Sequence, residues 1–307
     1  MTAASRELAA RLVRSGARRV AFLGLAKNVG KTTALVAVLA ELHAAGVASG
    51  VTSAGRDGES FDAITGEPKP RFRVWQGQTL ASAETTFAAA SCATETVEAL
   101  PFATRFGPIS VRRAASGGEI EMIGPSTASQ TATAAAALER AGARLVLLDG
   151  AIGRRAFACA RVADGIVLCA GLAGGPGLES ALGAARSAGE LLRLGLPRPG
   201  ASIRRVEGAL TGALLRAAPA ASGETLEAED FASIFLEPAE RAALRERGVS
   251  LAVRHAARLL AVTTNPTAPA RPPADPRRFF DLLAREFVDV PVFDVVADLQ
   301  SSPPAAS

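Results

Sequence analysis

The sequence predicts an α/β fold of three layers, in which a mostly parallel sheet carries helices on both faces. Continuous apolar runs of strand length recur along the chain, as they do in strands buried on both faces of a parallel sheet. Several of these runs are followed by a turn and a segment of helical spacing, which is the order of βαβ units. Of the 307 residues, 49% are hydrophobic and 21% are charged, so the chain is too apolar for a disordered protein.

In the first half of the chain we expect strands and helices to alternate. The expected strands are residues 19–24, 46–53, 72–76 and 144–151. The expected helices are residues 34–45, part of 77–99, and a segment that runs from a cap at 124–127 to about 141. Around Ser116-Gly117-Gly118, residues 109–114 and 119–123 are predicted to form a β-hairpin, because glycines favour tight turns.

The second half returns to the same pattern after one interruption. Strands are expected at residues 166–170, 259–266 and 290–295, and helices at 178–192 and 276–287. Residues from about 204 to 257 break this rhythm and are interpreted as a small inserted subdomain, whose acidic run at 224–230 is a candidate partner or substrate surface. We therefore expect one domain over residues 1–300 and a disordered tail at 301–307.

The segment Gly24-Leu25-Ala26-Lys27-Asn28-Val29-Gly30-Lys31-Thr32-Thr33 has the features of a phosphate-binding loop between a strand and a helix. In such a loop, backbone N–H groups and the helix N-terminus surround the β-phosphate, a lysine bridges the β- and γ-phosphates, and a hydroxyl binds Mg²⁺. The sequence assigns the lysine role to Lys31 and the hydroxyl role to Thr32. The residues expected to contact the nucleotide are Gly24, Asn28, Val29, Gly30, Lys31, Thr32 and Thr33.

The loop departs from the usual glycine spacing and contains two of the three lysines of the chain. The usual pattern G-x-x-x-x-G-K-[ST] is not met, because the first glycine is Gly24 and Leu25 stands five residues before Gly30. Lysine occurs only three times in this arginine-rich chain, at Lys27, Lys31 and Lys69. The use of lysine at Lys31 indicates a position that needs a compact ammonium group.

Two carboxylates are candidates to bind Mg²⁺ or to orient the attacking water beside the phosphates. Asp149 ends a continuous apolar run, as an acid that reaches Mg²⁺ through its water shell would. Asp57 lies between glycines after the second expected strand, where it could hold Mg²⁺ or orient the attacking water. Glu59 or Asp62 could take that role instead, and a solvated acidic turn is the plain alternative. Lys31, Asp57 and Asp149 are the predicted catalytic residues.

Asn265 ends the expected strand before the last helix, a place where its amide can offer both a donor and an acceptor to adenine. The N-K-x-D pattern that selects guanine is missing, because Pro266 follows Asn265. The predicted cofactors are therefore ATP and Mg²⁺.

The spacing Gly24-x5-Gly30-Lys31-Thr32-Thr33 resembles the loop of dethiobiotin synthetases and of related P-loop NTPases, which include the nitrogenase iron protein and septum-site ATPases. This resemblance implies a three-layer P-loop fold and leaves a homodimer open. Ala26 stands where dethiobiotin synthetases carry an aspartate, which argues against their ligase chemistry.

A narrower resemblance covers nearly the whole chain. The segments 52–59, 149–154, 206–211 and 262–266 are similar to P-loop proteins associated with adenosylcobalamin-dependent lysine 5,6-aminomutase, which act in its ATP-dependent reactivation. The resemblance implies an ATPase that serves as a reactivating chaperone and whose partner is a cobalamin-dependent aminomutase. ATP-dependent ligation or phosphorylation of a small metabolite bound near residues 107–130 stays open, as does a nucleotide-binding regulator without turnover.

Other functional classes find little support in the sequence. The sequence contains no unbroken run of 18 apolar residues, so no membrane span is predicted. The three cysteines form no disulfide pattern, so a cytoplasmic protein is expected. The net charge of +4 is scattered and no basic run is interleaved with aromatic residues, which disfavours nucleic acid as a partner. His43 and His255 stand alone, so neither a metal site built on histidine nor a catalytic triad is predicted.

Overall fold

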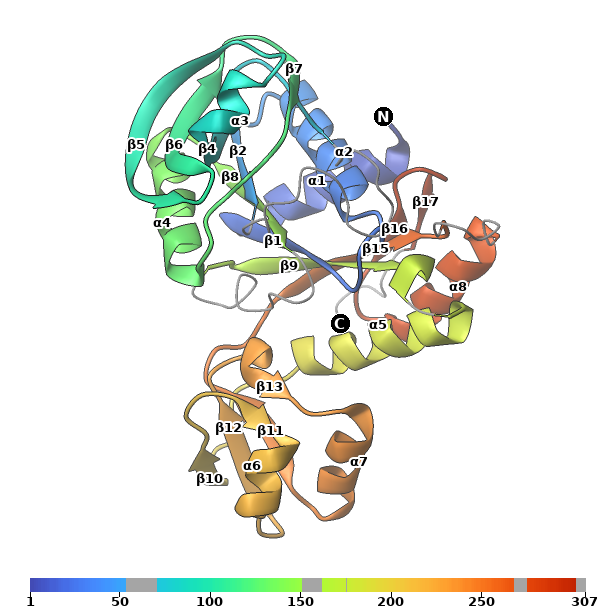
Figure 1. The fold of residues 1–307 in the computed structure, drawn as a ribbon. Coiled ribbons are helices and arrows are strands. Elements are labelled where there is room, and N and C mark those ends of the chain that lie inside the picture. The colour runs from blue at the N-terminus through green and yellow to red at the C-terminus, as the bar shows by residue number, and fades with distance from the viewer. Residues whose placement is uncertain (54–70, 151–161, 175, 268–274, 302–307) are drawn as a thin grey trace.

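A sheet of ten strands forms the centre of the molecule (Figure 1). The computed structural model describes residues 1–53, 71–150, 162–174, 176–267 and 275–301. From one edge to the other, the strands are β17 (Leu299–Gln300), β16 (Val292–Asp294), β15 (Leu259–Asn265), β9 (Gly165–Gly171), β1 (Arg19–Gly24), β8 (Leu145–Gly150), β2 (Ser49–Ser53), β4 (Thr79–Ala83), β6 (Gly107–Ala114) and β5 (Thr94–Thr104). The strands from β16 to β4 are parallel, and the outer strands β17, β6 and β5 pair antiparallel.

Helices cover both faces of this sheet. On one face lie α1 (Ala3–Arg14) and α2 (Lys31–Ala44), and on the other α4 (Ala128–Arg140), α5 (Leu178–Leu192) and α8 (Pro276–Glu286). The alternation of side chains along β1 fits both layers: Val20 and Phe22 pack in the core under α1 and α2, whereas Ala21 and Leu23 pack in the opposite core. The predicted α/β architecture with a mostly parallel sheet is confirmed.

The carboxyl ends of the central strands meet at one edge of the sheet. β1 lies between β8 and β9, with Phe22 paired to Asp149 and Gly24 paired to Cys169. β15 lies on the far side of β9, where Asn265 pairs with Gly171. Ligands of open α/β sheets bind at this edge, and the β1–α2 loop, residues 25–30, leaves β1 there.

A second, smaller unit occupies the place of the expected insertion (Figure 1, yellow to orange). It contains the three-stranded parallel sheet β10 (Ser202–Arg205), β12 (Glu224–Ala228) and β14 (Ser250–Val253). Short elements connect these strands: β11 (Leu210–Thr211), α6 (Gly212–Ala217), η3 (Phe231–Ser233), β13 (Ile234–Phe235) and α7 (Pro238–Glu246). The unit lies next to the carboxyl end of α5.

One expectation is confirmed in part and one is wrong. Residues 77–99 are helical only in part, as predicted, because the single helical turn α3 (Glu84–Ala88) lies between β4 and the beginning of β5, two strands that were not expected. Residues 109–114 and 119–123 do not pair as a hairpin, because β6 pairs with β4 and β5, whereas β7 (Gly118–Ile120) pairs with the distant β3 (Phe72–Val74). The pairings of β6 with β4 and of β7 with β3 join segments far apart in the sequence, whereas β5 and β6 form a local hairpin in which Thr104 pairs with Gly107.

The ends of the chain are tied together. α1 begins at a capping box of Thr2 and Ser5, and Thr2 also donates its hydroxyl to the carbonyl of Val295. At the other end Ser301 exchanges hydrogen bonds with Val292, so it belongs to the ordered edge of the sheet and not to a disordered tail. Residues 302–307 lie outside the described ranges. No helix within the described ranges combines the length and apolar character needed to cross a membrane.

Candidate functional site

The β1–α2 loop ends in a left-handed turn directly before α2. Asn28 has a φ of +59° and Gly30 a φ of +80°, a region that side chains other than Gly and Asn rarely adopt. Gly30 is the N-cap of α2 and offers no side-chain cap to the helix. The first turn of a 14-residue helix therefore begins without a side-chain acceptor, an arrangement that favours an anion at its N-terminus.

The loop is packed closely against the ends of neighbouring strands. Val29 is buried, and a Cβ on Gly171 would lie 2.8 Å from the Cα of Val29. A Cβ on Gly24 would lie 3.1 Å from the Cγ2 of Val29. The amide of Leu25 donates to the carbonyl of Cys169. Val29 thus packs the loop against β1 and β9, and Gly171 is a contact residue of the loop that was not predicted from the sequence.

Lys31 and Asp149 form an ion pair at the carboxyl ends of the central strands. Nζ of Lys31 lies 2.5 Å from Oδ1 of Asp149, and the two side chains are 18% and 10% exposed. Asp149 reaches Lys31 because it follows Leu145 and Leu147 on the face of β8 that packs under α1 and α2. The structure therefore brings together two residues that are far apart in the sequence and that were both predicted to act on phosphates.

The remaining residues of the loop pattern occupy the first turn of α2. Thr32 is half-buried and Thr33 is exposed. In the described part of the chain, no three side chains of His, Cys, Asp or Glu gather as a metal site. Mg²⁺ does not need such a group, because it is bound by one or two protein ligands together with phosphate oxygens and waters.

Cys169 lies on the neighbouring strand β9, where it pairs with Gly24 of β1, and is not a member of the ion pair. The thiol is fully buried, and this burial raises its pKa to about 12, with smaller opposing effects of a Thr263 hydrogen bond and the Lys31 charge. A thiol with this pKa stays protonated at neutral pH and is a packing residue.

Asn265 lies against the loop. Its Nδ2 donates to the carbonyl of Asn28 at 2.9 Å, and its Oδ1 accepts from the backbone N–H of Thr267 at 3.1 Å and from the Thr267 hydroxyl at 2.7 Å. The contact to Asn28 and the role of Thr267 had no signal in the sequence, since both depend on how β15 lies relative to the loop.

The other predicted acid, Asp57, lies outside the described residues, as do its alternatives Glu59 and Asp62. Its role as a metal ligand or water-orienting residue stays a prediction.

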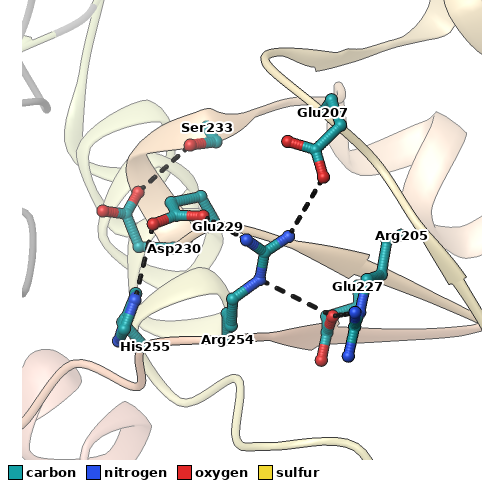
Figure 2. Close-up of polar contacts among 8 residues, drawn as sticks. All are labelled: Arg205, Glu207, Glu227, Glu229, Asp230, Ser233, Arg254 and His255. Carbon is teal, nitrogen blue, oxygen red and sulfur yellow. Dashed lines mark hydrogen bonds and ion pairs between the residues drawn. The ribbon is translucent and has the colours of Figure 1, made fainter.

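A second polar cluster lies at the carboxyl ends of β10, β12 and β14 (Figure 2). At its centre Arg254 contacts Glu229 at 3.0 Å, Glu207 at 3.5 Å and Glu227 at 3.7 Å. Glu227 also pairs with Arg205, and Glu229 lies 3.4 Å from Nε2 of His255.

Most of the acidic run expected to form a partner surface is used inside this cluster. Glu227 is buried in its ion pairs, and Asp230 is buried as the cap of η3, where it accepts from Ala232 and Ser233. These carboxylates stabilise the insertion itself. The expectation that residues 224–230 present an acidic docking surface is therefore wrong for Glu227 and Asp230.

No protein-family model, curated protein or solved structure matches the chain.

Proposed function

We propose that this protein binds Mg²⁺·ATP at the β1–α2 loop and hydrolyses it, as a P-loop NTPase does. The observation that carries the proposal is the pairing of Lys31 with Asp149 at the uncapped N-terminus of α2. A lysine at the start of a helix and an acid at the end of the adjacent parallel strand are the two charged groups that a triphosphate and its metal require.

The residues present fit this ligand. A Cβ on Gly30 would lie 2.9 Å from the Cβ of Asn265, so this N-cap position has no room for a larger residue, and Oδ1 of Asp149 is buried with Lys31 as its ion-pair partner. On binding, Lys31 would move from the carboxylate to the β- and γ-phosphate oxygens, and Thr32 and Asp149 would hold Mg²⁺. Bound Mg²⁺ neutralises charge that develops on the transferred phosphoryl group.

The proposal extends to a protein partner through the resemblance of four segments to reactivating factors. The free energy of ATP hydrolysis would be used to reactivate a cobalamin-dependent aminomutase and not to modify a metabolite. The insertion is the part of the chain that differs most from a minimal βαβ domain. ATP is proposed over GTP because Pro266 interrupts the guanine-selecting pattern.

The test is nucleotide binding and phosphate release with Mg²⁺ for wild type and Lys31→Ala, with ATP and GTP in parallel. We expect Lys31→Ala to weaken ATP binding by about 30-fold or more, since a buried charge contact to phosphate is lost. Arg277→Ala, which removes an exposed cation of α8, is the matched control. A well-folded wild type that binds neither nucleotide would exclude the proposal.

The same assay separates the alternatives. A reactivating ATPase should turn over slowly alone and faster with the partner enzyme. A ligase or kinase should release product only when a small acid or amine is added, and a regulator should bind ATP without releasing phosphate.

A further inference from the structure

Both ends of the Asn265 side-chain amide are used by the chain itself. The nitrogen donates to the carbonyl of Asn28, and the oxygen accepts two hydrogen bonds from Thr267. A carbonyl can only accept and a backbone N–H can only donate, so these contacts fix which way the amide faces. The acceptor that adenine recognition would need is therefore already occupied at both of its lone pairs.

The segment that Asn265 contacts is the left-handed part of the loop. Asn28 and Gly30 both have positive φ, and a Cβ on Gly30 would lie 2.9 Å from the Cβ of Asn265. A non-glycine residue in this region carries a cost and persists where its surroundings hold it. Asn265 supplies that support on both sides of Val29: it holds the carbonyl of Asn28 and lies in contact with Gly30.

We propose that Asn265 is a positioning residue that sets the shape of the β1–α2 loop for a phosphate chain, and that Thr267 orients Asn265. The hydrogen bond engages the carbonyl of Asn28 with the Asn265 side chain at the end of β15, so this carbonyl is not free to turn toward a ligand. A carbonyl turned toward a ligand would repel phosphate oxygens, whereas N–H groups attract them. The inference rests on the proposed function only in that the loop binds phosphates.

This role differs from base recognition in what it predicts for the ligand. A residue that reads adenine acts on ATP alone. A residue that shapes the loop acts equally on every ligand that carries the phosphate chain, whatever base is attached.

The test compares Mg²⁺ complexes of ATP, GTP and inorganic tripolyphosphate on wild type and Asn265→Ala. We expect the affinity for all three to fall by the same factor, about tenfold, which is the size of one lost hydrogen bond and its rearrangement. A loss for ATP with unchanged binding of tripolyphosphate would overturn the inference. A wild type that binds none of the three would overturn the phosphate site itself, and the inference with it.

A second pair of variants guards against a simple loss of folding. Thr267→Val removes the hydroxyl that donates to Oδ1, and it should weaken the three ligands by a common, smaller factor with an unchanged unfolding temperature. Thr267→Ser keeps a hydroxyl and should restore the affinity. If Thr267→Val and Thr267→Ser behave alike, Thr267 does not orient Asn265 and that part of the inference fails.

Discussion

In the ion pair of Lys31 and Asp149, each residue must exchange its partner before it can bind a ligand. A phosphate chain must take Lys31 from the carboxylate, and a divalent cation must take Asp149 from the ammonium group. Each ligand therefore releases the residue that the other needs. With only 18% and 10% of the two side chains exposed, water weakens this pair less than it weakens a surface pair. Metal and nucleotide should bind with positive coupling.

Removal of the carboxylate separates these effects. In Asp149→Asn, Lys31 loses its charged partner, so ATP without metal should bind more tightly than to wild type, by about tenfold for one charge-assisted contact. The gain in affinity from Mg²⁺ should largely disappear, and phosphate release should fall. The measurement is the dissociation constant of ATP with excess chelator and with Mg²⁺.

Asp281→Asn, which removes an exposed carboxylate of α8, is the control for a change in net charge. Metal-free ATP that binds Asp149→Asn no better than wild type would show that the ion pair does not compete with phosphate.

At the scale of the elements, β1 is fixed to α4 on the side opposite to its loop. Arg19 at the start of β1 donates from Nε and Nη2 to the two carboxylate oxygens of Glu139, both at 2.9 Å. The Arg19 hydrogen bonds hold the pKa of Glu139 below its usual value, against a smaller effect of burial. This two-bond contact orients the strand that carries the loop.

The lowered pKa gives a pH-dependent contribution to stability. The unfolded chain takes up a proton at Glu139 at a higher pH than the folded chain does, so the contribution is present above the unfolded pKa, near 4.3, and is lost as the pH falls through the folded pKa. Glu139→Gln should lower the free energy of unfolding at pH 7 by about 1 kcal/mol and should have a smaller effect near pH 3. Denaturant unfolding at both pH values measures this.

The matched control is Glu98→Gln. Glu98 of β5 pairs with the exposed Arg140, which belongs to α4 as Glu139 does, and both partners reach solvent. Its removal should change the stability little at either pH. An equal loss of unfolding free energy in both variants at pH 7 would show that the contact of Glu139 with Arg19 stabilises the protein no more than an exposed ion pair does.

The elements that could be predicted are those whose sequence pattern needs no distant partner. The apolar runs at β1, β8, β9 and β15 are buried along their length and were predicted nearly to their ends. Strands β4 and β5 were missed for the opposite reason, because their small and polar residues carry a weak strand signal. The strand at 109–114 was predicted but its pairing was wrong: the glycines at 117–118 indicated a local hairpin, whereas tertiary contacts pair β6 with β4 and β7 with β3.

The candidate site divides in the same way. Lys31 and Asp149 could be placed because each follows from a strand and the edge at which it ends. The contact between Asn265 and Asn28 could not, because it depends on the distance between β15 and a loop that leaves β1, with β9 lying between them. Helix α1 was not expected, since no functional motif drew attention to residues 3–14.

At the scale of the whole molecule, α5 joins the candidate site to the insertion. The helix follows β9, whose end contacts Val29, and it ends beside α7 (Figure 1). There the buried Arg241 of α7 donates to Glu190 and Ser187 of α5 and to the carbonyl of Leu236. α5 therefore contacts the insertion directly through Arg241, near the end of the helix that is farther in sequence from β9.

Arg241→Met tests whether this contact places the insertion. The variant keeps the volume and loses the hydrogen bonds to α5 and Leu236, so we expect a loss of about 2 kcal/mol in the free energy of unfolding, since the partners of a buried cation are left without it. Amide exchange in α7 should rise more than exchange in β1 and β8. ATP affinity should stay close to that of wild type, because the Lys31 and Asp149 pair is formed by other elements.

The same helix offers a control. Arg245 lies 3.9 Å from Glu190 and is 64% exposed, whereas Arg241 is 5% exposed. Exposed pairs contribute little to stability, so Arg245→Met should leave both stability and exchange in α7 nearly unchanged. If the two variants behave alike, the insertion is held by its apolar contacts alone. If Arg241→Met loosens α7 and also abolishes stimulation by a partner protein while basal phosphate release persists, the insertion is the element through which ATP hydrolysis acts on that partner.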